Sequence, residues 1–501
     1  MRSVAFSLLS LLLFSYESSA VKLSIQRPAV SRQRTALRGP KAATDVNNNL
    51  INKNNERYTA NITIEGRVVN VALDTGSTDL WVKPPEGLPS FNDTKLNATL
   101  RYGDGTDFVA GDIGVGKFEL GTEYSIPFQA FLNVQEAAAA EDPDFDDGIF
   151  GLWGLGFNTP GSSGVNDAVQ EAFGSTATWG QSVLANIFAA NPTGDDYIGI
   201  SLSRGGDTGG TADASLTISE YDSDYQAVAN SPKIPQNPVN SGAWTVTLDG
   251  LSIGGKKISW PSTMKEAPAG KNIVHLDTGT TNIMMPAAQV AAIYSAIPGA
   301  VLSPDSYIPQ TKFSTTYDVW VVPCNATPQV VASFGGQDFP IHPLDVTDMQ
   351  VVTSPDGLRN FTVCIGTFTD VGTIVDGASD ALFGDSFMRN AYSVFNFGTG
   401  GTTKGTPFVQ LLSQTDATKA GADLTTVRAA LMANMPPELA PVDIVRIFNG
   451  TESASGKGSS STGSGGKGGS GGSTGSTGAA LSMTPSLSLA GAILLLAVIS
   501  F

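Results

Sequence analysis

The chain has 501 residues, of which 56 are glycine and only 15% are charged, and its formal net charge at pH 7 is −17. Nucleic-acid-binding proteins need clustered Lys and Arg to neutralise phosphates, and the sequence has no such cluster. The bulk properties therefore argue against a nucleic-acid partner. They fit a protein of acidic media, where few basic groups limit the build-up of positive charge.

The N-terminal segments predict export. Residues 1–20 contain Arg2, an apolar run over 4–14 and a Ser-Ser-Ala ending, which is the pattern of a cleaved signal peptide. The run is short for a bilayer-spanning helix, which disfavours a permanent anchor. Residues 21–55 are basic and then Asn-rich. We interpret them as a short propeptide that covers a carboxylate-lined site until those carboxylates are protonated. A disordered arm is the alternative.

From about residue 57 the sequence predicts an all-β protein. Short runs rich in Val, Ile, Thr and Phe are broken by Gly, Asp and Asn pairs, which is typical of strands joined by tight turns. Predicted strands include 58–64, 68–73, 111–120, 243–253 and 391–397, and predicted helices include 181–190 and 287–296. A further helix is expected within 416–434, before three prolines. We expect the folded body to end near residue 415.

Two Asp-Thr-Gly turns form a weak internal repeat. Asp74 follows the apolar run 71–73 and Asp277 follows 273–276. A second pair of segments, 148–152 and 381–385, places an apolar-apolar-Gly motif later in each half. The repeat predicts two lobes, 56–222 and 223–415, which face each other across a cleft and contribute one carboxylate each.

A close pair of carboxylates can hydrolyse a peptide bond without a metal or a cofactor. Like charges a few ångströms apart cannot both ionise cheaply, so the pair shares one proton. One member then acts as a base toward water and the other as an acid toward the carbonyl. Asp74 and Asp277 are the candidate catalytic residues. Four neighbours support them: Gly76, Gly279, Ser77 and Thr280. The glycines let the backbone approach the carboxylates, and the hydroxyls can donate hydrogen bonds to the ionised form.

The sequences around the two turns suggest a family. Residues 74–82 (Asp-Thr-Gly-Ser-Thr-Asp-Leu-Trp-Val) and 277–281 (Asp-Thr-Gly-Thr-Thr) resemble the two active-site signatures of pepsin-like aspartic proteases, and 382–395 resembles their C-terminal signature. The similarity spans about residues 57–412. It implies a bilobal fold with a deep cleft between pseudo-symmetric lobes, acidic endopeptidase activity on proteins or peptides, no cofactor, and a monomer.

The resemblance also implies a substrate-binding set. Tyr102-Gly103-Asp104 is similar to the flap that closes over substrate, with Trp81 as the usual hydrogen-bond partner of the flap tyrosine. The remaining expected members of the set are Gly76, Gly279 and Thr281. The span from Asp74 to Tyr102 is shorter than the family usually has.

The only two cysteines, Cys324 and Cys364, stand where the family has its second-lobe disulfide, and an even number in an exported chain favours a bridge. The first lobe has no cysteine. By this resemblance, the segment 147–156 carries extra residues after the usual Gly-Leu, and Trp153 within it is interpreted as a packing residue.

One histidine lies close to the candidate site in sequence. His275 precedes Asp277 by two residues, so both side chains should lie on the same side of a strand. It either borders substrate or is satisfied by neighbouring polar groups without a catalytic part. The other histidine, His342, has no such context.

The C-terminal region predicts attachment to a membrane through a lipid. After a segment over 416–452, residues 453–480 form a Gly/Ser-rich stalk, and 481–501 comprise a spacer and an apolar tail, the pattern of a GPI-attachment signal. A tail-anchored helix is disfavoured because the apolar part is short and no basic residue follows it. We therefore expect a location at the cell surface or cell wall. Asn-X-Thr motifs that predict glycosylation are Asn61, Asn92, Asn97, Asn325, Asn360 and Asn449.

Parts of the sequence are compatible with three other functions. A non-catalytic pepsin-fold binding or cell-surface protein would not need both aspartates and Tyr102, which are all present. A serine hydrolase using Gly384-Asp385-Ser386 is disfavoured because neither histidine lies near that segment in sequence. An adhesive wall protein would not explain the paired turns.

Overall fold

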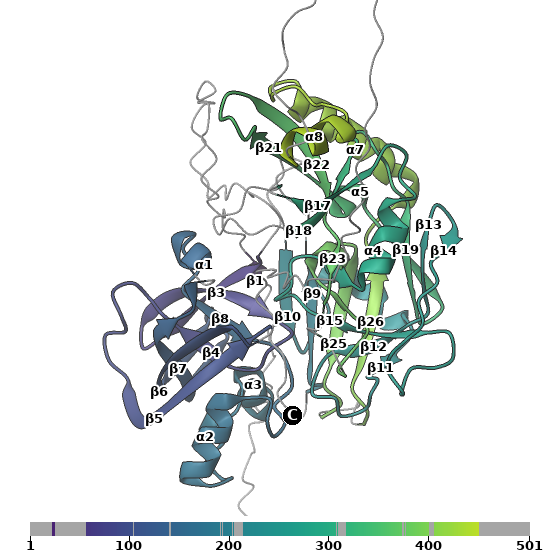
Figure 1. The fold of residues 1–501 in the computed structure, drawn as a ribbon. Coiled ribbons are helices and arrows are strands. Elements are labelled where there is room, and N and C mark those ends of the chain that lie inside the picture. The colour runs from purple at the N-terminus through teal and green to yellow at the C-terminus, as the bar shows by residue number, and fades with distance from the viewer. Residues whose placement is uncertain are drawn as a thin grey trace, which may run out of the picture.

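The computed structural model describes residues 23–25 and 57–449, except 104, 140–141, 191, 193, 203, 205–213, 307, 309–316, 373–374, 376 and 400–404. The predicted signal peptide, most of the propeptide, the stalk and the GPI signal lie outside the described residues. The described chain is built mostly of strands, arranged as two lobes on either side of a shared sheet (Figure 1). The all-β, bilobal prediction is therefore confirmed.

The N-terminal lobe contains a seven-stranded sheet in the order β2-β3-β8-β4-β7-β6-β5. Its strands are β2 (Thr59–Ile64), β3 (Arg67–Asp74), β4 (Leu80–Val82), β5 (Asn92–Tyr102), β6 (Asp107–Leu120), β7 (Tyr124–Ala137) and β8 (Gly151–Gly154). Its helices are α1 (Asp142–Asp146), α2 (Gly164–Phe173) and α3 (Val183–Ala190). The predicted helix over 181–190 corresponds to α3.

Helix α2 was not predicted, and its start explains why it forms. Ser163 is the N-cap and its Oγ accepts a hydrogen bond from the Asn166 amide. The buried carboxylate of Asp79 accepts hydrogen bonds from the amides of Gly164 and Val165. Both contacts satisfy amides that have no partner within the helix. The sequence did not reveal the second contact because Asp79 lies far from α2 along the chain.

The shared sheet has the order β1-β10-β9-β25-β26-β11 and joins the two halves through β9 and β25. Its strands are β1 (Leu23–Ile25), β9 (Tyr197–Ser201), β10 (Ala214–Ile218), β11 (Ile234–Pro235), β25 (Ala391–Asn396) and β26 (Phe408–Ser413). Strand β1 belongs to the predicted propeptide and pairs antiparallel with β10 at the edge of the sheet.

The C-terminal lobe contains three further sheets, in the orders β12-β15-β24-β16-β23, β14-β13-β19-β20 and β17-β18-β22-β21. Their strands are β12 (Thr245–Leu248), β13 (Gly250–Ile253), β14 (Lys256–Lys257), β15 (Asn272–Leu276), β16 (Ile283–Met285), β17 (Val301–Ser306), β18 (Tyr317–Val322), β19 (Val330–Phe334), β20 (Gln337–Ile341), β21 (Thr347–Thr353), β22 (Asn360–Gly366), β23 (Thr369–Asp370) and β24 (Ala381–Phe383). Short helices are α4 (Ala287–Tyr294), α5 (Pro343–Val346) and α6 (Asp385–Met388). The predicted strand over 243–253 is divided at Asp249, because β12 and β13 pair in different sheets.

The internal repeat is present in the sheets, with one correction. Strand β3 runs parallel to β8 and pairs Asp74 with Gly154, while β15 runs parallel to β24 and pairs Leu276 with Phe383, the residue before Gly384. Gly154 is thus the counterpart of Gly384. The predicted alignment of 148–152 with 381–385 is wrong by three residues, and the extra residues precede the motif. The misalignment arose because residues 149–151, immediately before 152–154, have the same apolar-apolar-Gly pattern.

The folded body does not end near residue 415. Helices α7 (Ala417–Met432) and α8 (Pro441–Phe448) follow β26 and cover one end of the C-terminal lobe (Figure 1). Arg428 of α7 is buried and donates to Cys364 Sγ at 2.7 Å and to the Thr347 carbonyl at 2.8 Å. Ile444 and Phe448 of α8 are buried in a cluster with strands β18, β21 and β22. These contacts extend the body to about residue 449.

The predicted disulfide is confirmed, since Cys324 and Cys364 are bonded with an S–S distance of 2.04 Å. Trp153 is also a packing residue as predicted. It is fully buried and meets Phe118 edge to face, with 5.7 Å between the ring centroids.

Candidate active site

The two Asp-Thr-Gly turns meet where the lobes join, and their threonines bind each other symmetrically. The Thr75 amide donates to Thr278 Oγ1 at 3.0 Å, and the Thr278 amide donates to Thr75 Oγ1 at 3.0 Å. Each hydroxyl also donates across the interface, Thr75 to the Leu276 carbonyl at 3.0 Å and Thr278 to the Leu73 carbonyl at 2.9 Å. This arrangement uses both the donor and the acceptor capacity of each hydroxyl, so it fixes one turn against the other.

Each aspartate accepts hydrogen bonds from its own turn. Oδ1 of Asp74 accepts from the Gly76 amide at 2.8 Å, and its Oδ2 accepts from Ser77 Oγ. Asp277 repeats the pattern: Oδ1 accepts from the amide two residues later at 2.8 Å, and Oδ2 accepts from Thr280 Oγ1 at 2.6 Å. These donors orient both carboxylates and favour their ionised forms.

The two carboxylates lie against each other's turns. A Cβ added to Gly76 would be 2.5 Å from Asp277 Oδ1, and a Cβ added to Gly279 would collide with Asp74 Oδ1 in the same way. Glycine is therefore required in both turns by close approach. The predicted roles of the two glycines, as points where backbone and carboxylate come together, agree with this geometry.

The site is almost completely buried, with Asp74 only 2% and Asp277 0% exposed. Burial, followed by the charge of Asp277, raises the pKa of Asp74 to about 7, against the hydrogen bond from Ser77. Burial also raises the pKa of Asp277, against the hydrogen bond from Thr280. The pair titrates as a unit, and its high affinity for a proton means that it carries at least one proton throughout the acidic range.

A family model described as eukaryotic aspartyl protease matches residues 85–402. The chain belongs to this family. The match includes Asp277 but begins after Asp74. The place of Asp74 in the site is therefore supported by the contacts between the two turns and not by the family match. Membership makes the chain an aspartic endopeptidase, a hydrolase of proteins or peptides.

Fungal relatives agree with this family. An aspartic protease from Phaffia rhodozyma is 28% identical over 352 residues, which cover 68% of this chain and 74% of that protein. Penicillopepsin-3 from Penicillium janthinellum is 26% identical over 361 residues, which cover 68% of this chain and 75% of that protein. The aspartic-type endopeptidase ctsD from Aspergillus fumigatus is 25% identical over 68% of this chain and 63% of its own length.

The residues assigned to the family's flap lie at the end of β5. Tyr102 is buried in one hydrophobic cluster with Trp81, and Gly103 has a φ of 59° in the turn that follows. Nε1 of Trp81 is buried and has no hydrogen-bond partner among the described residues. The expected hydrogen bond from Trp81 to Tyr102 is therefore absent, although both side chains belong to the same cluster. Asp104 lies outside the described residues.

Thr281 follows the second turn and its carbonyl accepts a hydrogen bond from the Ser386 amide at 3.0 Å. The contact connects the turn to α6. It gives Thr281 a structural contact in addition to the substrate-binding role that the resemblance implies.

Three residues of the site had no role in the sequence reasoning. Thr75 and Thr278 connect the lobes, and their occurrence in both turns was an available signal. Arg57 gave no signal, because its contact is with a residue more than two hundred positions away: its Nη1 donates to the Gly279 carbonyl at 2.9 Å. It also forms an ion pair with Asp144 of α1 at 3.3 Å.

His275 lies beside the pair, as its position in β15 predicted, and it is only 7% exposed. Val274 and Leu276 point into the main core, so the imidazole lies on the opposite side of the strand, shared with Asp277. Its Nε2 is buried without a hydrogen-bond partner among the described residues, which argues against an imidazole satisfied by polar neighbours. Burial lowers the pKa of His275 to about 4, while the charge of Asp74 acts in the opposite direction.

This depressed pKa predicts a loss of stability in acid. In the unfolded chain a histidine has a pKa of about 6.5 and is protonated below that pH. In the folded protein His275 stays neutral until the pH approaches 4. The free energy of unfolding should therefore fall as the pH decreases from about 6.5 to about 4, by on the order of 3 kcal/mol from this residue.

We expect His275→Leu to flatten the decline, as measured by urea unfolding at pH 6.5 and pH 4. His342→Asn keeps a side-chain acceptor at the N-cap of α5, where His342 Nδ1 accepts from the Leu344 amide at 3.2 Å. Because burial lowers the pKa of His342 to about 4 as well, this variant should also flatten the decline, and the two effects should add. An unchanged pH slope in His275→Leu would contradict the assignment of this proton to His275.

Proposed function

We propose that Asp74 and Asp277 are the catalytic residues of an acid-acting endopeptidase that is exported and held at the cell surface by a lipid. The observation that supports the catalytic pair best is the symmetric contact of the two turns, in which each carboxylate lies against the opposite glycine. Two such carboxylates must share a proton, and peptide hydrolysis requires this state because it provides one acid and one base in the same site.

The proposed reaction uses both protonation states of the pair. The ionised member accepts a proton from water while the water oxygen attacks the carbonyl carbon of the peptide bond. The protonated member donates its proton to the carbonyl oxygen, giving a tetrahedral diol. Collapse of the diol breaks the C–N bond and re-forms a C=O bond. One diol hydroxyl returns its proton to the pair, and the departing amine takes a proton from the pair, which ends with one shared proton as it began. Ser77 and Thr280 hold the carboxylates in position for these transfers, through the hydrogen bonds that each donates to its own aspartate.

Export and lipid attachment are supported by the patterns in 1–20 and 453–501 and by the disulfide, which suits an oxidising compartment. Among the helices of the described residues, none combines the length and the apolar character needed to cross a lipid bilayer. In the proposed precursor, residues 21–55 cover the site, and β1 provides a point of attachment by pairing with β10.

The proposed glycosylation is unevenly supported among the six motifs. Five acceptor residues are exposed: Asn61, Asn92, Asn97, Asn325 and Asn449. Asn360 is half-buried, and the threonine of its motif, Thr362, is fully buried with its hydroxyl donating to the Pro436 carbonyl at 2.6 Å. The amide nitrogen of Asn449 donates to the Pro304 carbonyl at 3.2 Å. Its amide oxygen also accepts from Ser303 Oγ at 3.0 Å. We therefore assign glycans to Asn61, Asn92, Asn97 and Asn325, where no such loss of contacts with the described residues is involved.

The catalytic proposal is tested by cleavage of a denatured protein at about pH 3 to 5 with wild type and Asp74→Asn. We expect the asparagine variant to lose at least about a thousandfold in kcat/KM, because the remaining carboxylate has no partner with which to share the proton. Thermal unfolding monitored by circular dichroism confirms that the variant is folded. A peptide with a secondary alcohol in place of the scissile amide should inhibit the wild type. Equal cleavage by both proteins would exclude Asp74 from the chemistry.

A further inference from the structure

Arg57 connects the N-terminal lobe to the second Asp-Thr-Gly turn. It lies two residues before β2, and its Nη1 donates to the Gly279 carbonyl at 2.9 Å. The amide of the same Gly279 donates to Asp277 Oδ1 at 2.8 Å. A single residue therefore separates the guanidinium from one member of the pair, and Arg57 has no equivalent contact with the turn of Asp74 among the hydrogen bonds of the described residues.

The position of the guanidinium is fixed from the other side by α1. Nε of Arg57 lies 3.3 Å from Asp144 Oδ2, and both side chains are only 12% exposed. Solvent and salt screen a charge weakly at such a position. A guanidinium remains charged at every pH at which the enzyme can act, so Arg57 is a constant positive charge beside the second turn.

The effect of this charge differs between the two aspartates. Burial raises the pKa of Asp277, and the rise is opposed by hydrogen bonds from Thr280, Asp74 and Gly279 and then by the charge of Arg57. At Asp74 the opposing groups are the hydrogen-bond donors of its own turn, Ser77 and Gly76. Arg57 is therefore a source of asymmetry in a site whose hydrogen bonds are otherwise nearly symmetric.

The other ionisable groups around the pair do not supply the same asymmetry. His275 on β15 is neutral above about pH 4 because burial lowers its pKa. Asp385 of α6 interacts with Arg389 at the end of that helix. On the far side of Arg57, α1 carries Asp144 and Asp146, and Asp147 follows it.

We propose that Arg57 is a positioning residue that draws the negative charge of the singly protonated pair onto Asp277 and leaves the shared proton on Asp74. The inference rests on the proposed catalytic pair. It goes beyond that proposal by assigning the base and the acid: Asp277 takes the proton of the attacking water, and Asp74 donates to the carbonyl oxygen.

The proposal predicts the direction in which the pH profile moves. A positive charge near the pair favours every ionised state, so its removal should shift both limbs of the kcat/KM profile to higher pH. For Arg57→Gln we expect a shift of about 0.5 to 1 pH unit. Arg57→Lys keeps the charge and should restore most of the wild-type profile. Asp144→Asn keeps an acceptor for Arg57 and removes its countercharge, so both limbs should move slightly in the opposite direction, to lower pH.

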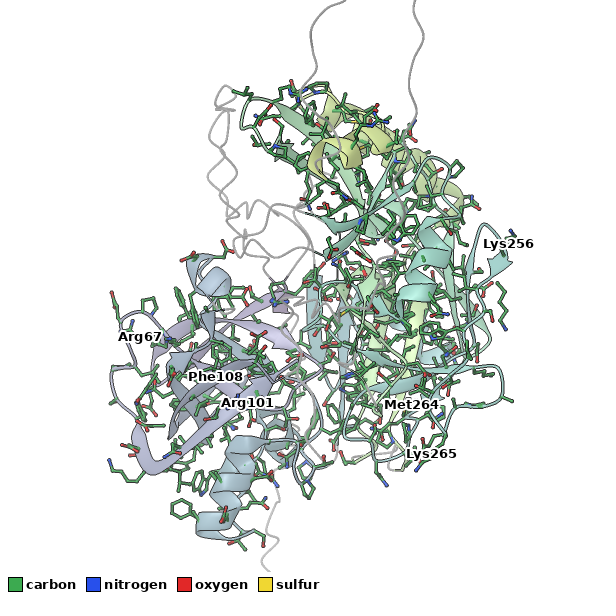
Figure 2. All side chains as sticks on the ribbon, in the orientation of Figure 1. Arg67, Arg101, Phe108, Lys256, Met264 and Lys265 are labelled. Atoms are coloured by element: carbon green, nitrogen blue, oxygen red, sulfur yellow. A yellow bond between two sulfur atoms is a disulfide. The ribbon has the colours of Figure 1, made fainter. Side chains whose placement is uncertain are left out.

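Lys256→Gln is the matched control, because it removes one positive charge from an exposed position on β14, at the outer edge of the C-terminal lobe (Figure 2). Its profile should coincide with that of the wild type. If Arg57→Gln lowers kcat/KM by the same factor at every pH, Arg57 is only a tether between the lobes and the proposal is overturned. If Arg57→Gln does not fold, the test uses Asp144→Asn instead. A kcat/KM profile of Asp144→Asn that coincides with that of the wild type then overturns the proposal.

The assignment of charge to Asp277 has its own readout in stability. In the Asp74→Asn background, adding Arg57→Gln should lower the free energy of unfolding by an amount that grows as the pH rises from 3 and Asp277 becomes ionised. In the Asp277→Asn background the growth should be smaller, because only the ion pair with Asp144 remains. Equal growth in both backgrounds would overturn the assignment. Equal cleavage by wild type and Asp74→Asn would instead refute the catalytic pair itself, so the two failures are distinguishable.

Discussion

Replacing Gly76 or Gly279 with alanine is expected to lower kcat by at least about a hundredfold, because a displacement of about 1 Å in the reacting groups has an effect of that size. A Cβ on Gly76 would lie 2.5 Å from Asp277 Oδ1 and 2.8 Å from its Cγ. These atoms belong to a carboxylate held by two hydrogen bonds, so the methyl group and the carboxylate cannot both keep their places. The pair would be forced apart and would no longer share its proton.

The expected loss is specific to the chemistry rather than to folding. Neither glycine has a positive φ, so alanine is compatible with the backbone of both turns. The matched control is Gly421→Ala in α7, where the added Cβ would meet Thr327 at an ordinary 3.7 Å. It should leave kcat unchanged and stabilise the helix by a few tenths to about 1 kcal/mol. If Gly76→Ala retained kcat within about twofold of the wild type, the two turns could not be packed as closely as described.

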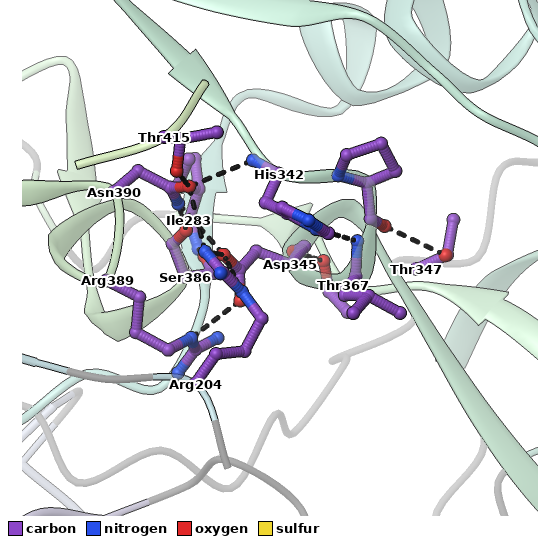
Figure 3. A network of polar contacts seen from close by, with 12 residues as sticks. Arg204, Ile283, His342, Asp345, Thr347, Thr367, Ser386, Arg389, Asn390 and Thr415 are labelled. Carbon is purple, nitrogen blue, oxygen red and sulfur yellow. Dashed lines mark hydrogen bonds and ion pairs between the residues drawn. The ribbon is translucent and has the colours of Figure 1, made fainter. Parts of the chain in front are cut away.

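Replacing Asp345 with asparagine is expected to lower the free energy of unfolding by about 3 to 5 kcal/mol. Asp345 in α5 is completely buried between two arginines (Figure 3). Its Oδ2 accepts from Arg204 Nε at 2.9 Å and its Oδ1 accepts from Arg389 Nε at 2.6 Å. Asn390 donates to the same carboxylate at 2.9 Å. The variant would leave two largely buried guanidinium groups without their countercharge.

The pH dependence of this effect follows from the sign of the pKa change. Burial alone would raise the pKa of Asp345, but Arg204 and Arg389 together hold it well below its usual range. Its contribution is therefore complete above the unfolded-state pKa of about 3.9 and is lost only as the pH falls further. The loss in Asp345→Asn should be larger at pH 6 than at pH 2.

Urea unfolding at several pH values measures this difference. Asp338→Asn is the matched control, since Asp338 is exposed and accepts one hydrogen bond, from Ser333 Oγ. Its effect should stay within about 0.5 kcal/mol. A similarly small effect for Asp345→Asn would show that the buried network contributes little to stability.

The reaction class was predictable because the residues that indicate it lie in short, contiguous motifs. An Asp-Thr-Gly turn after a strand brings its carboxylate, its glycine amide and its hydroxyl together within four residues, as both turns do. Two copies indicate two lobes. The disulfide was predictable for a different reason, since two cysteines allow only one pairing.

The errors also have identifiable causes. The second motif of the N-terminal half was misaligned because 149–151 and 152–154 have the same apolar-apolar-Gly pattern, and only the pairing of Asp74 with Gly154 distinguishes them. The end of the body was placed too early because α7 is polar on most of its surface. Its attachment depends on single buried side chains such as Arg428, which no periodicity reveals.

The sequence by itself determined the reaction class and the all-β, two-lobed architecture and pointed to the two aspartates that we propose as catalytic, because local motifs and alternation encode these features. Only the tertiary structure decided what surrounds each carboxylate. Arg57 reaches Gly279, and Arg204 reaches Asp345, across separations of 222 and 141 residues. A contact between two residues so far apart depends on the folding of everything between them, and it leaves no spacing in the sequence from which it could be inferred. The two turns are similar but not equivalent in the sequence, and the guanidinium of Arg57 adds a difference between them that the sequence does not show.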